Sequence, residues 1–95
     1  MGPTCEVHLA VVDDHTLIAI YRLLTTVADR IDRTRKDRVW DIWIHGRPVH
    51  VHAIEPRRVA TLSAGCITPD DYDVLRELSA AIVDTVGGVA SEPEK

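Results

Sequence analysis

The most constraining feature of this sequence is an alternation of apolar and polar residues that recurs between residues 40 and 64. Successive side chains of a β-strand point to opposite faces of a sheet, so a period of two predicts strands that bury one face. Gly46-Arg47 separates the first two runs and predicts a two-residue turn of the II′ kind, with Arg47 solvated. A second turn is predicted over residues 54–58, which contain Pro56. The region therefore predicts two consecutive hairpins.

Counting outward from the two turns assigns the side chains of these three strands to two faces. In this register His52 lies opposite Asp41, and His50 lies opposite Trp43 and Ser63. The apolar face is expected to pack on helices, and the other face is expected to stay open. The apolar face is formed by Trp40, Ile42, Ile44, Val49, Val51, Ala53, Ala60, Leu62 and Ala64. The open face is formed by Asp41, Trp43, His45, His50, His52, Ile54, Val59, Thr61 and Ser63.

Two segments show the three-and-four spacing of apolar residues that is typical of an amphipathic helix. The first covers residues 15–35 and follows Asp13 and Asp14, which together supply an N-cap. Its polar end contains acid–base pairs four residues apart, such as Asp29 and Arg33. The second follows Thr68 and Pro69, which are typical of a helix start, and ends at the glycines 87–88. Two helices are therefore predicted.

With a further strand over residues 4–12, the predicted element order is β-α-β-β-β-α. We predict an α+β fold, a two-layer sandwich in which two helices pack on one face of a four-stranded, mostly antiparallel sheet. The first strand is expected to run parallel to its neighbour, because a single helix returns the chain to the sheet. Whether it lies beside the second or the fourth strand is left open by the pattern. Residues 1–88 are expected to form the single domain, and residues 89–95 a flexible C-terminal tail.

Charge and cysteine content exclude several classes of partner. The net charge is −4, and acidic and basic residues are intermixed along the chain, which argues against nucleic acid. Glu6 and His8 interrupt the apolar N-terminal run, so neither a signal peptide nor a membrane partner is predicted. Cys5 and Cys66 match no disulfide framework or metal motif, so a reducing, cytoplasmic location is expected.

The predicted open face carries one of the two tryptophans and, if the first strand adds Glu6 and His8 to it, four of the five histidines. Aromatic residues at the centre of a patch are typical anchors of protein interfaces. We therefore predict a small interaction module that forms a homodimer through this face or an edge strand, and that neutralises or regulates a partner protein. A monomer with a solvated, histidine-rich face is the simpler alternative. The predicted interface residues are Trp43, His45, His50, His52, Ile54, Val59 and Thr61.

Metal binding is the alternative function. His50 and His52 are two residues apart on one strand face, a separation from which two imidazoles can reach one ion. Asp41 is a candidate third ligand, with His8 or His45 completing the set. Under this hypothesis the cofactor is zinc or another divalent transition metal, whereas the interaction module requires no cofactor.

Catalysis is the weakest of the hypotheses. Cys66 precedes the second helix, whose dipole favours a thiolate, and Ser63 lies opposite His50. The sequence has no Gly-x-Ser-x-Gly elbow and no evident oxyanion hole. A binding role is therefore favoured over an enzymatic one.

Overall fold

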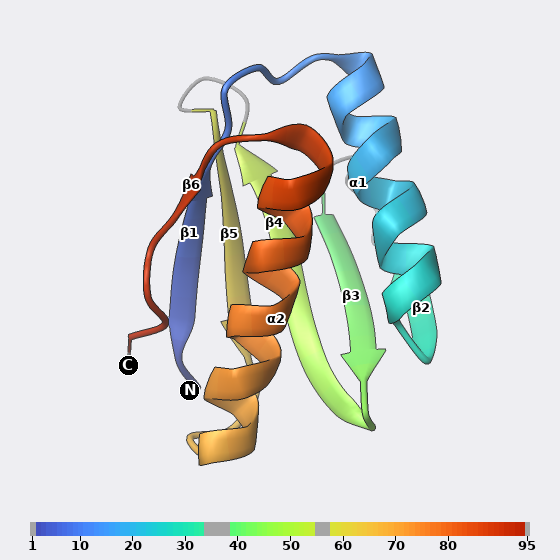
Figure 1. Ribbon diagram of the computed structural model, residues 1–95. Helices are drawn as coiled ribbons and strands as arrows, with labels where there is room; N and C mark the ends of the chain where they lie inside the picture. Colours follow the sequence, from blue (N-terminus) through green and yellow to red (C-terminus); the bar gives the residue numbers. More distant parts are fainter. Residues whose placement is uncertain (1, 34–38, 55–57, 95) are drawn as a thin grey trace.

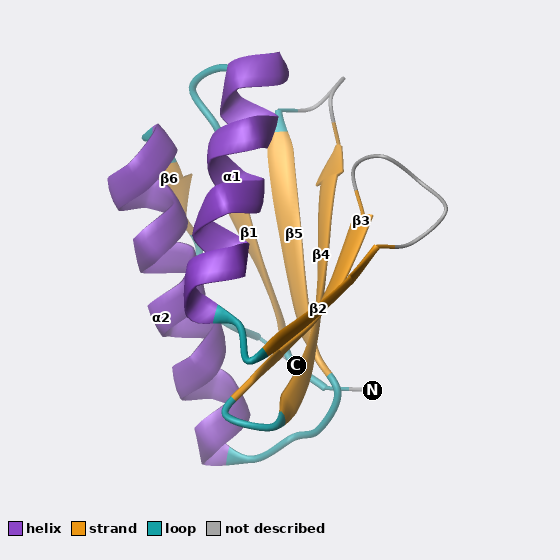
Figure 2. Cartoon of the chain, turned by 90° about the vertical axis from the view of Figure 1, so that its right-hand side faces the viewer, coloured by secondary structure: helices purple, strands orange, loops and turns teal. Residues whose placement is uncertain are grey.

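The structure, a computed structural model, describes residues 2–33, 39–54 and 58–94, without the side chains of residues 33, 53 and 54 (Figure 1). Six strands form one antiparallel sheet in the order β2-β3-β4-β5-β1-β6. Both helices lie on the same side of the sheet, as Figure 2 shows, so the predicted α+β class is confirmed. In chain order the elements are β1 (Thr4–His8), α1 (Asp14–Val27), β2 (Arg30–Arg33), β3 (Val39–Ile44), β4 (Arg47–Ile54), β5 (Val59–Ala64), α2 (Pro69–Val86) and β6 (Val89–Ala90).

The first helix is shorter than the 15–35 predicted, because the chain leaves it at residue 28 and enters β2. The last helical residues are the β-branched 25–27, which are weak helix formers, and Ala28 is extended with φ −83° and ψ 142°. The Asp29 N–H then donates to the Trp43 carbonyl at 2.7 Å, which starts the pairing of β2 with β3. Asp29 and Arg33 therefore share no helical turn, and the four-strand count is wrong.

The extra strand also changes the direction of β1 relative to its neighbour. β1 pairs with β5 in the antiparallel sense, with Thr4 opposite Ser63 and His8 opposite Val59. The helix does return the chain so that β1 and β2 run the same way, but β2 lies at the far edge of the sheet. The expectation of a parallel neighbour for the first strand is therefore wrong.

The segment after Gly88, expected to be a flexible tail, is hydrogen-bonded to β1. Val89 and Ala90 form β6, and farther on the backbones of Thr4 and Glu94 exchange two hydrogen bonds of 2.6 and 2.7 Å. Gly88 has φ 118°, and a Cβ there would collide with the His8 carbonyl oxygen. Only glycine suits this position, because the chain both turns with positive φ and passes against β1.

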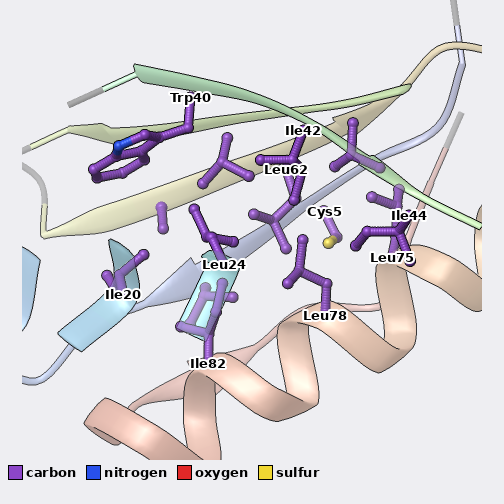
Figure 3. Close-up of a cluster of buried hydrophobic side chains, with 14 of the residues drawn as sticks. Cys5, Ile20, Leu24, Trp40, Ile42, Ile44, Leu62, Leu75, Leu78 and Ile82 are labelled. Carbon is purple, nitrogen blue, oxygen red and sulfur yellow. The ribbon is translucent and has the colours of Figure 1, made fainter. Parts of the chain in front are cut away.

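The core lies between the apolar side of the sheet and the two helices (Figure 3). Ile42, Val51 and Leu62, on three adjacent strands, are fully buried, as the alternation predicts. Cys5 joins them at 2% exposure, and burial raises the pKa of its thiol to about 11. The helices contribute Ile20, Leu24, Leu75, Leu78 and Ile82.

The second helix starts and ends as predicted. The Thr68 side chain accepts a hydrogen bond from the Asp71 N–H, Pro69 occupies the first turn, and Gly87 ends the helix with φ 79°. At the first helix, the Asp13 carboxylate accepts from the Thr16 N–H and hydroxyl, and these bonds lower the pKa of Asp13.

Arg47, expected to be solvated, links the β3–β4 hairpin to the start of α2. Its guanidinium donates to the Asp71 carboxylate at 2.9 Å and to the Asp70 carboxylate at 3.0 Å. Asp71 is only 1% exposed and also accepts from the Thr68 hydroxyl. A buried carboxylate requires such partners, because an unpaired charge in the interior is strongly unfavourable.

Arg47→Met should lower the free energy of unfolding by about 2 to 3 kcal/mol, because it leaves the Asp71 carboxylate buried without its charge partner. Urea unfolding measures this. Arg76→Met is the matched control, since it removes only the exposed pairs with Asp73 and Glu92 and should leave the midpoint almost unchanged. Equal losses in the two variants would contradict the structural role of Arg47.

The two cysteines should differ sharply in reactivity. At pH 8 a chromogenic disulfide reagent should modify Cys66, which is exposed, at once, and Cys5 only after denaturation.

The raised pKa of the Cys5 thiol also makes stability pH-dependent. The folded protein keeps the proton to a higher pH than the unfolded chain does, so stability present below pH 9.0 should fall as pH rises towards about 11. Cys5→Ala should remove this part of the slope, and an unchanged slope would contradict the assignment.

Candidate functional site

The β3–β4 turn fixes which residues meet on the open face. β3 and β4 close with Ile44 opposite Arg47, so the turn consists of His45 and Gly46, with φ 53° and 75°. Two positive φ values define a type I′ turn rather than the II′ turn predicted over residues 46–47. Asp29 accepts a hydrogen bond from the Gly46 N–H at 2.9 Å and helps to hold this turn.

The observed register differs from the predicted one by two residues, which keeps the described side chains of the two strands on their predicted faces but changes their partners. Asp41 lies opposite His50, and Trp43 lies opposite Pro48, so the predicted pairing of Asp41 with His52 is wrong. Across the next strand pair the predictions are confirmed, because His50 lies opposite Ser63 and His52 opposite Thr61.

His45 is separated from the other predicted interface residues. It lies exposed in the turn, and beside Val27 and Leu78 it lines a hollow on the helix side of the sheet. Val59 is on the open side of β5 but is only 7% exposed, and Thr61 is half-buried. Ile54 pairs with Val59 through its backbone, and its side chain lies outside the described residues.

The centre of the open face is polar, and Trp43 lies to one side of it. β4 and β5 are the two middle strands, and their open side carries His50, His52, Thr61 and Ser63. Trp43 is on β3, where the Arg30 guanidinium lies 4.5 Å from the centre of its ring, a cation–π contact. The predicted aromatic centre of the patch is therefore an aromatic flank beside a polar centre.

Arg30 and Asp32 were missed by the sequence analysis, because both were assigned to the first helix. In β2 they lie opposite Trp43 and Asp41, and the Arg30 guanidinium donates to the Asp32 carboxylate at 2.9 Å. The polar-apolar-polar order of Arg30, Ile31 and Asp32 was the available signal for a strand.

Asp41, His50 and His52 form a compact cluster on the open face. The Asp41 Oδ1 and His50 Nδ1 atoms are 2.7 Å apart, and both side chains are about half exposed at 45% and 46%. A carboxylate accepts hydrogen bonds, so Nδ1 of His50 carries the hydrogen, and Nε2 presents a lone pair when the ring is neutral. The His50 and His52 rings are 6.5 Å apart between centroids and are inclined by 70°.

A shallow hollow of about 330 Å³ lies between this cluster and Trp43. Its lining includes Trp43, Pro48, His50 and Ser63. Within the described residues no hydrogen bond joins Ser63 to His50, and the backbone N–H groups around Ser63 are used by strand pairing. Among the described residues, Ser63 therefore has neither a base bonded to its hydroxyl nor free backbone N–H groups beside it.

Over residues 2–33, 39–54 and 58–94, no three His, Cys, Asp or Glu side chains are gathered closely enough to hold a metal ion. Asp41 accepts a hydrogen bond from His50. Of the predicted ligands Asp41, His50 and His52, the two imidazoles are therefore the candidate donors to a metal, and the carboxylate orients one of them. On β1, Glu6 and His8 extend the face, with the Glu6 Oε2 and His8 Nε2 atoms 3.6 Å apart. Neither described helix is both long and apolar enough to span a membrane.

A scan against protein-family models, a search of curated proteins and a search of solved structures each found no match for this chain. The chemistry of the open face is therefore the basis on which a function is inferred.

The two tryptophans should report separately on the two faces. Trp40 is 5% exposed in the core, whereas Trp43 is half-buried on the open face. At a concentration at which the protein is monomeric, emission of Trp40→Phe, which retains Trp43, should be red-shifted and readily quenched by acrylamide, and emission of Trp43→Phe should be blue-shifted and protected. Adding Arg30→Met to Trp40→Phe should increase quenching further, because the guanidinium no longer covers the ring. Equal quenching of the two single variants would contradict the assignment of faces.

Proposed function

We propose that this chain is a small cytoplasmic protein-interaction module that pairs with a second copy of itself through the open sheet face. Through this association it regulates or neutralises a partner protein. The observation that carries the proposal is the one-sided packing of the sheet: both helices cover one face (Figure 2), and the other presents the Trp43 ring, a hollow and two imidazoles. No described helix or strand packs on that second face.

The size of the open face suits a second copy. Six strands at about 4.8 Å spacing are roughly 29 Å wide, and the molecule measures 33 × 24 × 21 Å. The broad face thus offers roughly 800 Å², which is what each partner buries in a standard protein interface. Two sheets can pack about 10 Å apart, as in a β-sandwich, with their side chains meeting in between.

The two-fold symmetry of a homodimer determines where the Trp43 rings and the histidines of the two copies would meet. In an isologous dimer both copies use the same patch, so each contact off the two-fold axis occurs twice. Trp43 on β3 lies off the centre of the sheet, whereas His50 and His52 on β4 lie close to it. The dimer would therefore have two aromatic contacts flanking a polar centre.

Trp43→Asp should weaken dimerisation by roughly thirtyfold or more, the loss expected at a hot-spot position, because it places a carboxylate in the aromatic contact. Sedimentation velocity over a concentration series measures the association, and circular dichroism checks that the fold is retained. The matched control is Ile18→Asp, which alters an apolar residue that is 49% exposed on α1 and should leave association unchanged. A wild-type protein that stays monomeric at high micromolar concentration would remove the proposal.

The second candidate is a metal-binding protein in which one copy holds a divalent transition metal through His50 and His52. The observation that favours it is the 2.7 Å hydrogen bond that His50 Nδ1 donates to Asp41, since metal-bound histidines usually donate their other ring nitrogen to a carboxylate or carbonyl. Elemental analysis of protein purified without added metal separates this candidate from an interaction module that needs no metal.

A further inference from the structure

We infer that His50 and His52 are half of a metal site that two copies of the chain complete together, with four imidazoles around one divalent transition-metal ion such as Zn²⁺. This inference rests on the proposed pairing of open faces. It adds that the polar centre of the dimer binds one metal ion per two chains through imidazole nitrogen atoms.

The two imidazoles of one copy are close to the spacing that a shared ion requires. Their centroids are 6.5 Å apart, whereas two imidazoles on one tetrahedral zinc, with Zn–N bonds of about 2.0 Å, stand roughly 5 Å apart. His50 is 46% exposed and His52 is partly exposed, so small side-chain rotations can close this difference without moving the strand.

Asp41 prepares one of the donors. By accepting a hydrogen bond from Nδ1 of His50 at 2.7 Å, it fixes the ring orientation and leaves Nε2 as the free donor. His52 has no hydrogen-bond partner among the described residues, so its ring can turn towards the same ion. Asp41 thus acts as a positioning residue, and the two histidines act as ligands.

One copy supplies too few donors for a closed site, because a tetrahedral zinc site takes four ligands. β4 is one of the two middle strands, so a two-fold axis that runs along the strands through the centre of the face brings the β4 strands of both copies close to it. Sheets pack about 10 Å apart, strands about 4.8 Å apart, and the chain rises about 3.4 Å per residue. With these spacings, the Cα atom of each of the four histidines lies roughly 6.5 Å from the point midway between them. A histidine side chain with a Zn–N bond of about 2.0 Å spans that distance.

Charge on the face also favours a cation between the two copies. The described side chains on the open side of β1 to β5 include three carboxylates and one guanidinium, so two such faces repel each other when the histidines are neutral. A dication bound by neutral imidazoles offsets part of this repulsion. Imidazole donors suit zinc, copper and nickel, whereas magnesium and calcium prefer oxygen ligands. The charged residues are Glu6, Arg30, Asp32 and Asp41.

The test uses full-length protein freed of metal with EDTA and then titrated with Zn²⁺, followed by native mass spectrometry and sedimentation velocity. The expected result is a dimer with one zinc per two chains, and a dimer dissociation constant at least tenfold lower with Zn²⁺ than without. His50→Ala and His52→Ala should each abolish this gain. Asp41→Asn should weaken zinc binding by about 10- to 100-fold at unchanged stoichiometry, the effect typical of a supporting carboxylate.

His15→Ala and His45→Ala are matched controls, because both remove an exposed imidazole outside the open face and should keep the zinc response. Circular dichroism shows whether each variant is folded. One zinc per chain on a monomer, or a zinc response that survives both ligand substitutions, would overturn the shared site. A dimer that Trp43→Asp disrupts but zinc does not strengthen would overturn the shared site alone. A chain that is monomeric with and without zinc would overturn the proposed pairing as well.

Discussion

The two-residue turn at His45 and Gly46 determines the register of β3 and β4, and both layers of the molecule depend on it. Its two positive φ values give a type I′ turn, whose twist matches that of the flanking strands. Closing the hairpin between Ile44 and Arg47 brings Asp41 opposite His50 on the open face. The same closure makes Arg47 the first residue of β4, from which its guanidinium reaches the buried Asp71 at the start of α2. One turn therefore positions both the histidine cluster and the link to the helices.

The faces of the sheet could be predicted from the sequence, whereas the turn could not. Alternation alone decides sidedness, and Ile42, Val51 and Leu62 are all fully buried as it requires. Gly46 satisfies a positive φ equally well as the first residue of a II′ turn or the second of a I′ turn. The hydrogen bond from the Gly46 N–H to Asp29 supports the second arrangement. Asp29 is 17 positions away in the chain, so the residues of the turn alone could not predict this hydrogen bond.

The contribution of Arg30 and Asp32 to the open face could not be predicted, because residues 28–33 fit both the helical and the strand periodicity. Ala28 and Ile31 continue the helical spacing of α1, yet Arg30, Ile31 and Asp32 also alternate as a strand. Pairing with β3 decides between them, and such pairing is tertiary information that a local pattern lacks. The consequence for the site is chemical: Arg30 lies over the Trp43 ring and adds the one described positive charge to an otherwise acidic face.

The division of the sheet into two faces leaves the open face free for the proposed binding. The core is built on the helix-facing side, so changes to His50 or His52 remove few buried apolar contacts. The histidine cluster is nevertheless held by a rigid strand. β4 is paired on both sides, and its first residue, Arg47, is hydrogen-bonded to Asp71 at the start of α2. Donors that a rigid strand already holds in place lose little conformational entropy when they bind a partner or an ion. The same histidines on a free loop would lose that advantage, so strand pairing would contribute to the affinity of the proposed site.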